Sequence, residues 1–118
     1  MASVHLPVAL AGALVAMKAH AAMAPDRAPD KAAGDVYDAY RLIRAWGPSV
    51  IATDLSRAPA IMLRTTSTQL RHLLLDDVAR TEHRLRRSSV PGVQSVGEAQ
   101  LEAAGTIVDL LAPFLQWD

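Results

Sequence analysis

Apolar residues recur at intervals of three and four through most of this sequence, and prolines and glycines interrupt the pattern at several points. The longest stripe includes Leu70, Leu74, Val78 and Leu85, and it predicts one long helix over about 68–87. Proline cannot continue the backbone hydrogen bonds of a helix, and glycine commonly ends one. The chain is therefore expected to fold into helices joined by short loops.

The N-terminal part of the chain predicts a first helix over 9–23, which is rich in alanine and leucine. Its apolar residues Leu10, Leu14 and Met17 recur at helical spacing. Residues 24–30 contain two prolines and are predicted as a loop. This first helix is therefore expected to end before the loop and to be followed by a second one.

The second helix is predicted to begin at Pro29 and Asp30, residue types that favour a helix start, and to end at Trp46. Gly47 and Pro48 follow directly and stop it. The apolar residues that share one face of this helix are Val36, Tyr40, Ile43 and Trp46. That face is expected to lie in the core.

The remaining segments are less regular. Ser49 is a candidate N-cap for a short helix over 50–56. Residues 60–68 contain the run TTST, which suits a strand or a capped turn equally well. Ser95 precedes a last apolar-periodic segment, and Glu98 stands three residues later, which is the pattern of a capping box. We therefore expect a final helix that begins after Ser95.

The length of 118 residues is enough for one domain, and 1–118 is expected to form a single helical domain. Hydrophobic residues make up 51% of the chain but aromatic residues only 4%, so the core must consist mainly of aliphatic side chains. The predicted fold class is mainly α, an irregular bundle of four to five helices. Residues 3–8 are predicted to add a short edge strand or an extended arm.

The composition argues against several classes of function. Lys plus Arg and Asp plus Glu both number 12, so bulk charge gives no argument for nucleic-acid or membrane binding. Cysteine is absent, which excludes disulfide scaffolds and thiol nucleophiles. The apolar N-terminal segment has no basic start, and Lys18 interrupts it, so neither a signal peptide nor a membrane span is expected. A cytoplasmic location is the expectation.

Lys18 is the only charged side chain before Asp26, and it lies on or beside the apolar face of the first helix. A lysine taken into a core needs a carboxylate partner. Asp35 and Asp38 lie on adjacent turns of the second helix, with Arg41 nearby. Lysine beside helical carboxylates suits the binding of phosphates with a divalent metal. In the alternative interpretation Lys18 is solvated and Asp38 pairs locally with Arg41.

The stretch that carries a family resemblance is LPVALAGALVAMKAHAAMAPDRAPDKAAGDVYDAYRLI, residues 6–43. It resembles the lysine helix and the Asp-rich helix in the second half of AbiEii-type nucleotidyltransferase-like proteins, which are often toxins of bacterial toxin–antitoxin pairs. Beyond Trp46 the resemblance is general. It implies a protein that binds a nucleoside triphosphate with Mg²⁺.

The resemblance also implies roles for individual residues. Lys18 would contact the triphosphate or the acceptor, and Asp35 would be a catalytic carboxylate and metal ligand. Asp38 and Arg41 would support the site. The residues that would bind phosphates together with Lys18 are Arg27 and Lys31.

The sequence also departs from the family pattern. It has no Gly-Ser turn and no Asp-x-Asp strand, which supply metal-binding carboxylates in the family. The resemblance therefore implies a truncated or split nucleotidyltransferase-like protein that is inactive alone. Expected partners are a second copy of the chain, a complementing N-terminal half chain or an antitoxin.

Two alternatives remain open. The first is a helical protein-interaction module that kept the fold of the family but lost its catalytic activity. Such a module would bind a partner through exposed apolar surface. The second is RNA binding through a basic stripe that includes Arg80, Arg84 and Arg87. Such a stripe is also typical of a solvated face near a helix C-terminus, where cations complement the helix dipole.

Overall fold

Helices form most of residues 8–115, the part of the chain that this computed structural model describes. The α-helices are α1 (Val8–Ala22), α2 (Pro29–Trp46), α3 (Pro48–Leu55), α4 (Ala60–Arg71), α5 (Val78–Arg86), α6 (Glu98–Gly105) and α7 (Ile107–Leu111). A π-helical turn covers His72–Asp76, and 3₁₀ turns cover Val93–Ser95 and Ala112–Leu115. No strand occurs between residues 8 and 115, which confirms the mainly α fold class. Apart from Val8, which opens α1, the strand or arm predicted over 3–8 lies outside the described residues.

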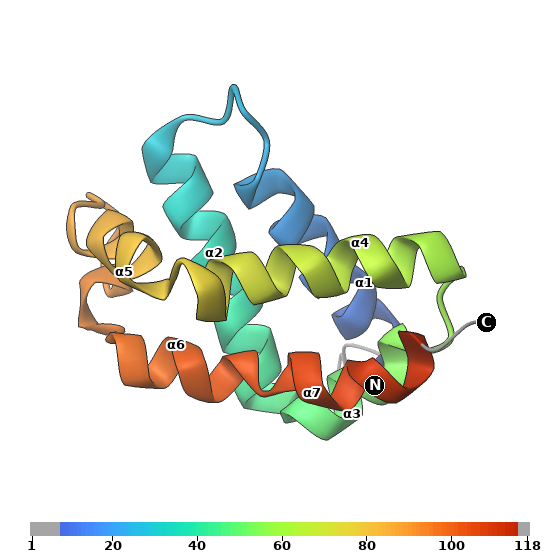
Figure 1. The fold of residues 1–118 in the computed structure, drawn as a ribbon. Helices are drawn as coiled ribbons and strands as arrows, with labels where there is room; N and C mark the ends of the chain where they lie inside the picture. The colour runs from blue at the N-terminus through green and yellow to red at the C-terminus, as the bar shows by residue number, and fades with distance from the viewer. Residues whose placement is uncertain (1–7, 116–118) are drawn as a thin grey trace, which may run out of the picture.

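The helices pack around the hairpin of α1 and α2. α1 also contacts α3 and α4, and α2 contacts α5 and α6. Figure 1 shows α4 crossing this hairpin, while α6 and α7 follow one another along the lower edge. α3 lies against α7, so the middle of the chain meets its C-terminal part. Segments far apart in the sequence therefore share one core.

The core is almost entirely aliphatic, as the composition predicts. Its largest fully buried side chains are Val15, Ile43, Ile51, Leu70, Leu74, Leu85, Val93, Leu101, Ile107, Val108 and Leu111. Within the described helices these residues belong to one continuous cluster. Three of the four residues on the predicted face of α2, Val36, Tyr40 and Ile43, are buried, and Trp46 packs partly against the cluster. The amphipathic pattern of α2 was therefore sufficient to define its buried face.

Two of the three apolar residues that predicted the first helix, Leu14 and Met17, are not buried in the core. The core-facing residues are Ala11, Val15 and Ala19, each fully buried, while Met17 is 54% exposed. Leu14 is only half-buried. Nearly every side chain of α1 is apolar, so spacing alone does not select a face. Small residues at the contact allow α1 and α2 to approach closely, and this packing decides the orientation.

The long helix predicted over 68–87 is interrupted. α4 begins at Ala60, so the ambiguous segment 60–68 is helical, and α5 begins only at Val78. Between them lies the π-helical turn, which ends at Asp77 with φ −120° and ψ 34°. A π turn inserts an extra residue into the helical repeat. It thereby keeps buried side chains of both α4 and α5 directed at the core.

The last helix also differs from its prediction. The helix begins after Gly97, whose N–H donates a hydrogen bond to Gln100 Oε1 at 2.8 Å, and not after Ser95. The Ser95 hydroxyl instead donates to the Gly92 carbonyl at 2.8 Å. The helix is then divided at Thr106 into α6 and α7. The predicted capping pattern of Ser95 and Glu98 is therefore not used.

A membrane span needs a long and continuously apolar helix. None of the helices within residues 8–115 has the length and apolar character that crossing a bilayer requires. This agrees with the sequence-based expectation for the first helix. It applies to the described residues only.

Gly105 marks the closest approach between α6 and the π-helical turn. A Cβ added at Gly105 would lie 2.6 Å from Leu75 Cδ2 and 3.2 Å from Leu74 Cβ. Leu74 is fully buried and its Cβ is fixed by the backbone, so the turn has little room to move. The interrupted helix therefore depends on a residue without a side chain at position 105.

We predict that Gly105→Ala destabilises the protein by about 1–2 kcal/mol, because the new methyl group overpacks this contact. Gly34→Ala is the matched control, since a Cβ there meets nothing within 4 Å and Gly34 lies inside α2. The control is expected to stabilise the protein by about 0.5–1 kcal/mol. Urea denaturation of both variants measures the difference. Equal effects at the two glycines would show that the contact with Leu75 is not tight.

Candidate functional site

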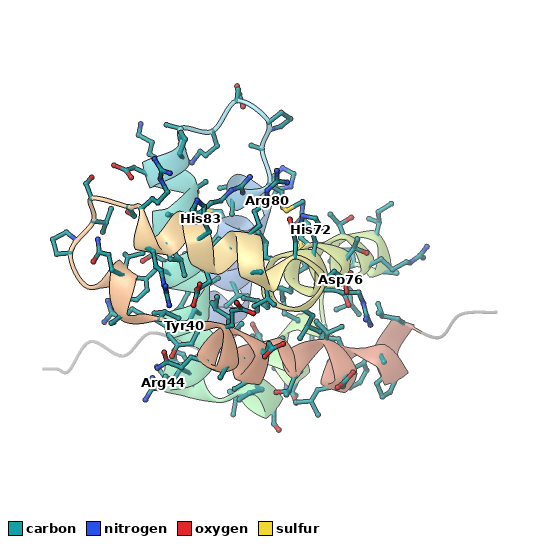
Figure 2. The ribbon with its side chains drawn as sticks, turned by 60° about the vertical axis from the view of Figure 1, so that its left-hand side comes forward. Tyr40, Arg44, His72, Asp76, Arg80 and His83 are labelled. Atoms are coloured by element: carbon teal, nitrogen blue, oxygen red, sulfur yellow. The ribbon has the colours of Figure 1, made fainter. Side chains whose placement is uncertain are left out.

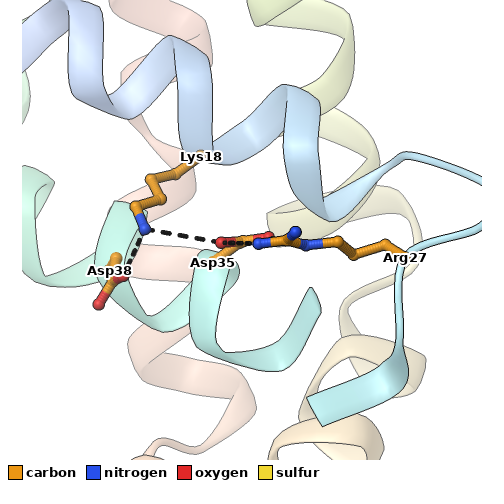
Figure 3. A network of polar contacts seen from close by, with 4 residues as sticks. All are labelled: Lys18, Arg27, Asp35 and Asp38. Carbon is orange, nitrogen blue, oxygen red and sulfur yellow. Dashed lines mark hydrogen bonds and ion pairs between the residues drawn. The ribbon is translucent and has the colours of Figure 1, made fainter. Parts of the chain in front are cut away.

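The α1–α2 hairpin brings Lys18 to both carboxylates predicted as its partners. Lys18 Nζ lies 2.9 Å from Asp38 Oδ2 and 3.6 Å from Asp35 Oδ1. Figure 3 shows the lysine reaching from α1 across to α2, with the two aspartates on successive turns. The predicted meeting of Lys18 and Asp35 is confirmed.

Asp35 is the buried member of this cluster, and Arg27 is its main partner. The side chain of Asp35 is 4% exposed. Arg27, in the loop between α1 and α2, donates from Nε to Oδ2 at 2.9 Å and from Nη2 to Oδ1 at 3.2 Å. Such bidentate, charge-assisted bonds compensate the cost of burying a carboxylate. Arg27 therefore connects the loop to the inner face of α2.

Lys18 is held mainly by Asp38. The hydrogen bond to Asp38 is the largest cause that raises the pKa of Lys18 above its ordinary value of 10.5, and burial opposes it. The charges of both aspartates add to the increase. Because the pKa is raised by folding, the contribution of Lys18 to stability is complete below about pH 10.5 and is lost as the pH rises through the raised value. Lys18 is thus a cation throughout the neutral range.

The local chemistry does not fit a magnesium site built by Asp35. Both oxygens of Asp35 face cations, Arg27 on one side and Lys18 on the other. Mg²⁺ requires free carboxylate oxygens in octahedral geometry, so it would have to displace these partners. No group of three or more potential ligands occurs among the described histidines and acids. In this arrangement Asp35 positions cations, and its role as a metal ligand stays a prediction.

A hollow of about 320 Å³ opens beside the cluster. Its lining residues are Leu14, Lys18, Asp38, Arg41, Leu42 and Ala45. The side chain of Lys18 is 29% exposed and that of Asp38 is 46% exposed, so both are accessible from this side. The lining of this hollow therefore combines the Lys18–Asp38 ion pair with apolar side chains.

The other predicted site residues, Arg41 and Lys31, take no part in these ion pairs, although Arg41 lines the same hollow as Lys18 and Asp38. Arg41 makes no ion pair with Asp38 but stands over the ring of Tyr37, with Cζ 5.6 Å from the ring centroid. The local Asp38–Arg41 pair of the alternative interpretation is therefore absent. Lys31 is exposed in the first turn of α2 and forms no ion pair with another described residue. Its predicted contact with phosphates stays a prediction.

The basic stripe of α5 is partly neutralised. Arg80 lies 3.8 Å from Asp77, and Arg86 lies 3.1 Å from Glu82. Figure 2 shows Arg80 and His83 on this helix, with His72 nearby at the start of the π-helical turn. Of the three arginines in the predicted stripe, only Arg80 takes part in an ion pair among the described residues, so RNA binding through the stripe stays a prediction.

Sequence reasoning underestimated Arg27 and missed Tyr40 and Arg44. Arg27 was predicted to bind phosphates, whereas in the structure it supplies the bidentate partner of Asp35. Arg44 Nη1 donates to Tyr40 Oη at 2.9 Å along α2. Their spacing of one helical turn was a visible signal. The spacing did not show that α6 packs opposite these two residues and completes a hollow with them.

We predict that Arg27→Met destabilises the protein by about 2–3 kcal/mol, because it leaves the buried Asp35 with only its longer contact to Lys18. Lys18→Met is expected to cost less than about 1 kcal/mol, since Asp35 keeps Arg27 and the exposed Asp38 returns to water. Thermal and urea denaturation at neutral pH compare the two variants. A larger loss for Lys18→Met would contradict this order.

Comparison with known proteins identifies no relative from which a role for the cluster could be transferred. No family model, no curated protein and no solved structure matches the chain. What the cluster does is therefore inferred from its contacts, its burial and its charge.

Proposed function

We propose that this chain is the helical part of an AbiEii-type nucleotidyltransferase-like domain, in which Lys18 binds the phosphates of a nucleoside triphosphate. The observation that supports this proposal is the cluster of Lys18, Asp35 and Asp38, formed by two helices. The family resemblance implies roles for the same residues. The phosphate contact that the resemblance implies for Lys18, together with its partly exposed position in this cluster, supports this function over a purely structural lysine.

Lys18 has the properties that phosphate binding requires. It is cationic, partly exposed, and located at the rim of the hollow that Leu14 and Leu42 line. Its closest partner, Asp38, is the more exposed of the two aspartates and releases the ammonium group at little cost. Asp35 and Arg27 remain in place beneath it and fix the helix that faces Lys18.

In this proposal the metal-binding carboxylates come from another chain or segment. The oxygens of Asp35 are occupied by cations, and the sequence has no Asp-x-Asp motif. Nucleotidyl transfer generally needs carboxylates that hold divalent metal ions at the reacting phosphate. The chain therefore contributes the phosphate-binding lysine to a composite site, and it is inactive without the complementing half.

We predict that ATP with Mg²⁺ shifts the amide resonances of Leu14, Lys18 and Leu42 in the isolated chain. Lys18→Met should weaken this binding at least about tenfold, because a charge-assisted hydrogen bond to phosphate is lost. Asp38→Asn should strengthen it, since it removes the competing carboxylate. Arg57→Met is the control for loss of an exposed positive charge elsewhere. Unchanged binding in Lys18→Met would contradict the proposal.

A second candidate is self-association through an apolar surface. Ile61 and Met62, in the first turn of α4, are 73% and 49% exposed, and Phe114 is 51% exposed. The 3₁₀ turn that carries Phe114 contacts α4, so these side chains belong to neighbouring elements. Exposed apolar groups at one end of a small protein favour association. A second copy of the chain is the occupant that this candidate names.

If this surface forms a dimer, the double variant Ile61→Ser/Met62→Ser will sediment as a monomer at concentrations where the unchanged chain associates. Met17→Ser is the matched control, because Met17 is 54% exposed on α1. Sedimentation velocity over a range of concentrations measures the effect. A monomeric unchanged chain, or an equally large effect of Met17→Ser, would reject this surface.

A further inference from the structure

A second hollow lies on another side of α2, where α2 faces α6. Its volume is about 450 Å³. It is lined by Tyr37, Tyr40, Arg41, Arg44, Ala45, Ser95, Val96 and Gln100. Figure 2 shows Tyr40 and Arg44 together close to α6. No carboxylate contributes to the lining, whereas two guanidinium groups do.

The two tyrosines hold these guanidinium groups in place. Arg44 Nη1 donates to Tyr40 Oη at 2.9 Å, and Arg41 stands over the Tyr37 ring. The tyrosine rings themselves are stacked, with centroids 6.4 Å apart and an interplanar angle of 27°. Tyr40 is buried, so its hydroxyl is a fixed acceptor. The arginines are thus oriented by neutral partners.

Because their partners are neutral, the two positive charges are not compensated. Neither Arg41 nor Arg44 forms an ion pair within residues 8–115. The closest acid along α2 is Asp38, and it is paired with Lys18. A guanidinium has five N–H donors in a plane that suits phosphate oxygens, and the contact with a tyrosine uses at most one of them. An anion with two negative charges would match this pair.

A third hollow adjoins the second and is more apolar. It measures about 340 Å³ and shares Tyr40, Arg44 and Gln100 with its neighbour. The remaining lining residues are Ile43, Pro48, Ala103 and Ala104. An apolar group in this hollow could be covalently bonded to an anion that Arg44 binds, because Arg44 lines both hollows. The two hollows together therefore offer a charged part and an apolar part.

We propose that this double hollow between α2 and α6 binds a phosphate monoester with a small, largely apolar organic group. The phosphate accepts hydrogen bonds from Arg41 and Arg44, and the organic group lies against Pro48, Ala103 and Ala104. A phosphate monoester carries nearly two negative charges at pH 7, which matches the two guanidinium groups. A carboxylate carries only one. This site adjoins the hollow beside Lys18, with which it shares Arg41 and Ala45, but Lys18 does not line it and it does not rest on the function proposed above.

Phenyl phosphate, inorganic phosphate and benzoate are the probes that test this inference. Each is titrated into the isotope-labelled chain while amide shifts are followed by NMR. Phenyl phosphate is expected to shift residues of α2 and α6 and to bind at least about tenfold more tightly than either of the others. Inorganic phosphate lacks the apolar group, and benzoate lacks the second charge. Equal affinity for phenyl phosphate and benzoate would overturn the proposal, as would shifts confined to other helices.

Variants locate the site. Arg44→Gln and Arg41→Gln should each weaken phenyl phosphate at least about tenfold, because each loses charge-assisted hydrogen bonds. Tyr40→Phe provides a variant that keeps both charges but frees Arg44, and it should weaken binding by less. Lys18→Met should weaken phenyl phosphate less than either arginine variant while it weakens ATP at least about tenfold, which distinguishes the two sites. Arg57→Gln controls for net charge, and equal loss in this control would attribute the binding to nonspecific attraction.

Discussion

Asp35 is the constraint around which the first two helices are arranged. A carboxylate with a side chain 4% exposed is stable only if cations reach it, and Arg27 and Lys18 do so from different segments. One of them lies in the interhelical loop and the other on α1, so both must be in register with α2. The ion pairs therefore specify how the hairpin closes. The aliphatic contacts of Val15 and Ile43 supply most of the stabilisation, because burial of apolar surface is the dominant favourable contribution to folding.

The different sides of α2 have different chemistry, and this explains its central place in the fold. One side carries Val36 and Ile43 into the core, and another carries Asp35 and Asp38 toward α1. A third presents Arg44 toward α6, where Tyr40 rather than a carboxylate holds it. Positive charge is thus neutralised on the α1 side and left free on the α6 side. That contrast is why a structural ion-pair cluster and a proposed anion site can occupy one helix.

Much of the candidate site was predictable from spacing. Lys18 is a lone charge in an apolar helix, so it either reaches water or meets a carboxylate, and Asp35 and Asp38 were suitable carboxylates on the next helix. Which aspartate would be buried was not predictable, because both lie on adjacent turns of one helix. The bidentate contact of Arg27 depends on the path of a loop, which spacing does not describe. The hollow at Arg44 needs α6 beside α2, a contact between distant segments.

The sequence by itself determined the mainly helical fold, the extent of α2 and the two carboxylates of α2 that were candidate partners of Lys18. These depend on hydrogen bonds and periodicity within a few residues, so they can be read locally. Only the tertiary structure decided which face of α1 is buried and where the helix predicted over 68–87 is interrupted. Small residues in α1 and Gly105 in α6 set these features through close packing. Close packing joins distant segments, and its geometry is fixed only when all the helices are in place.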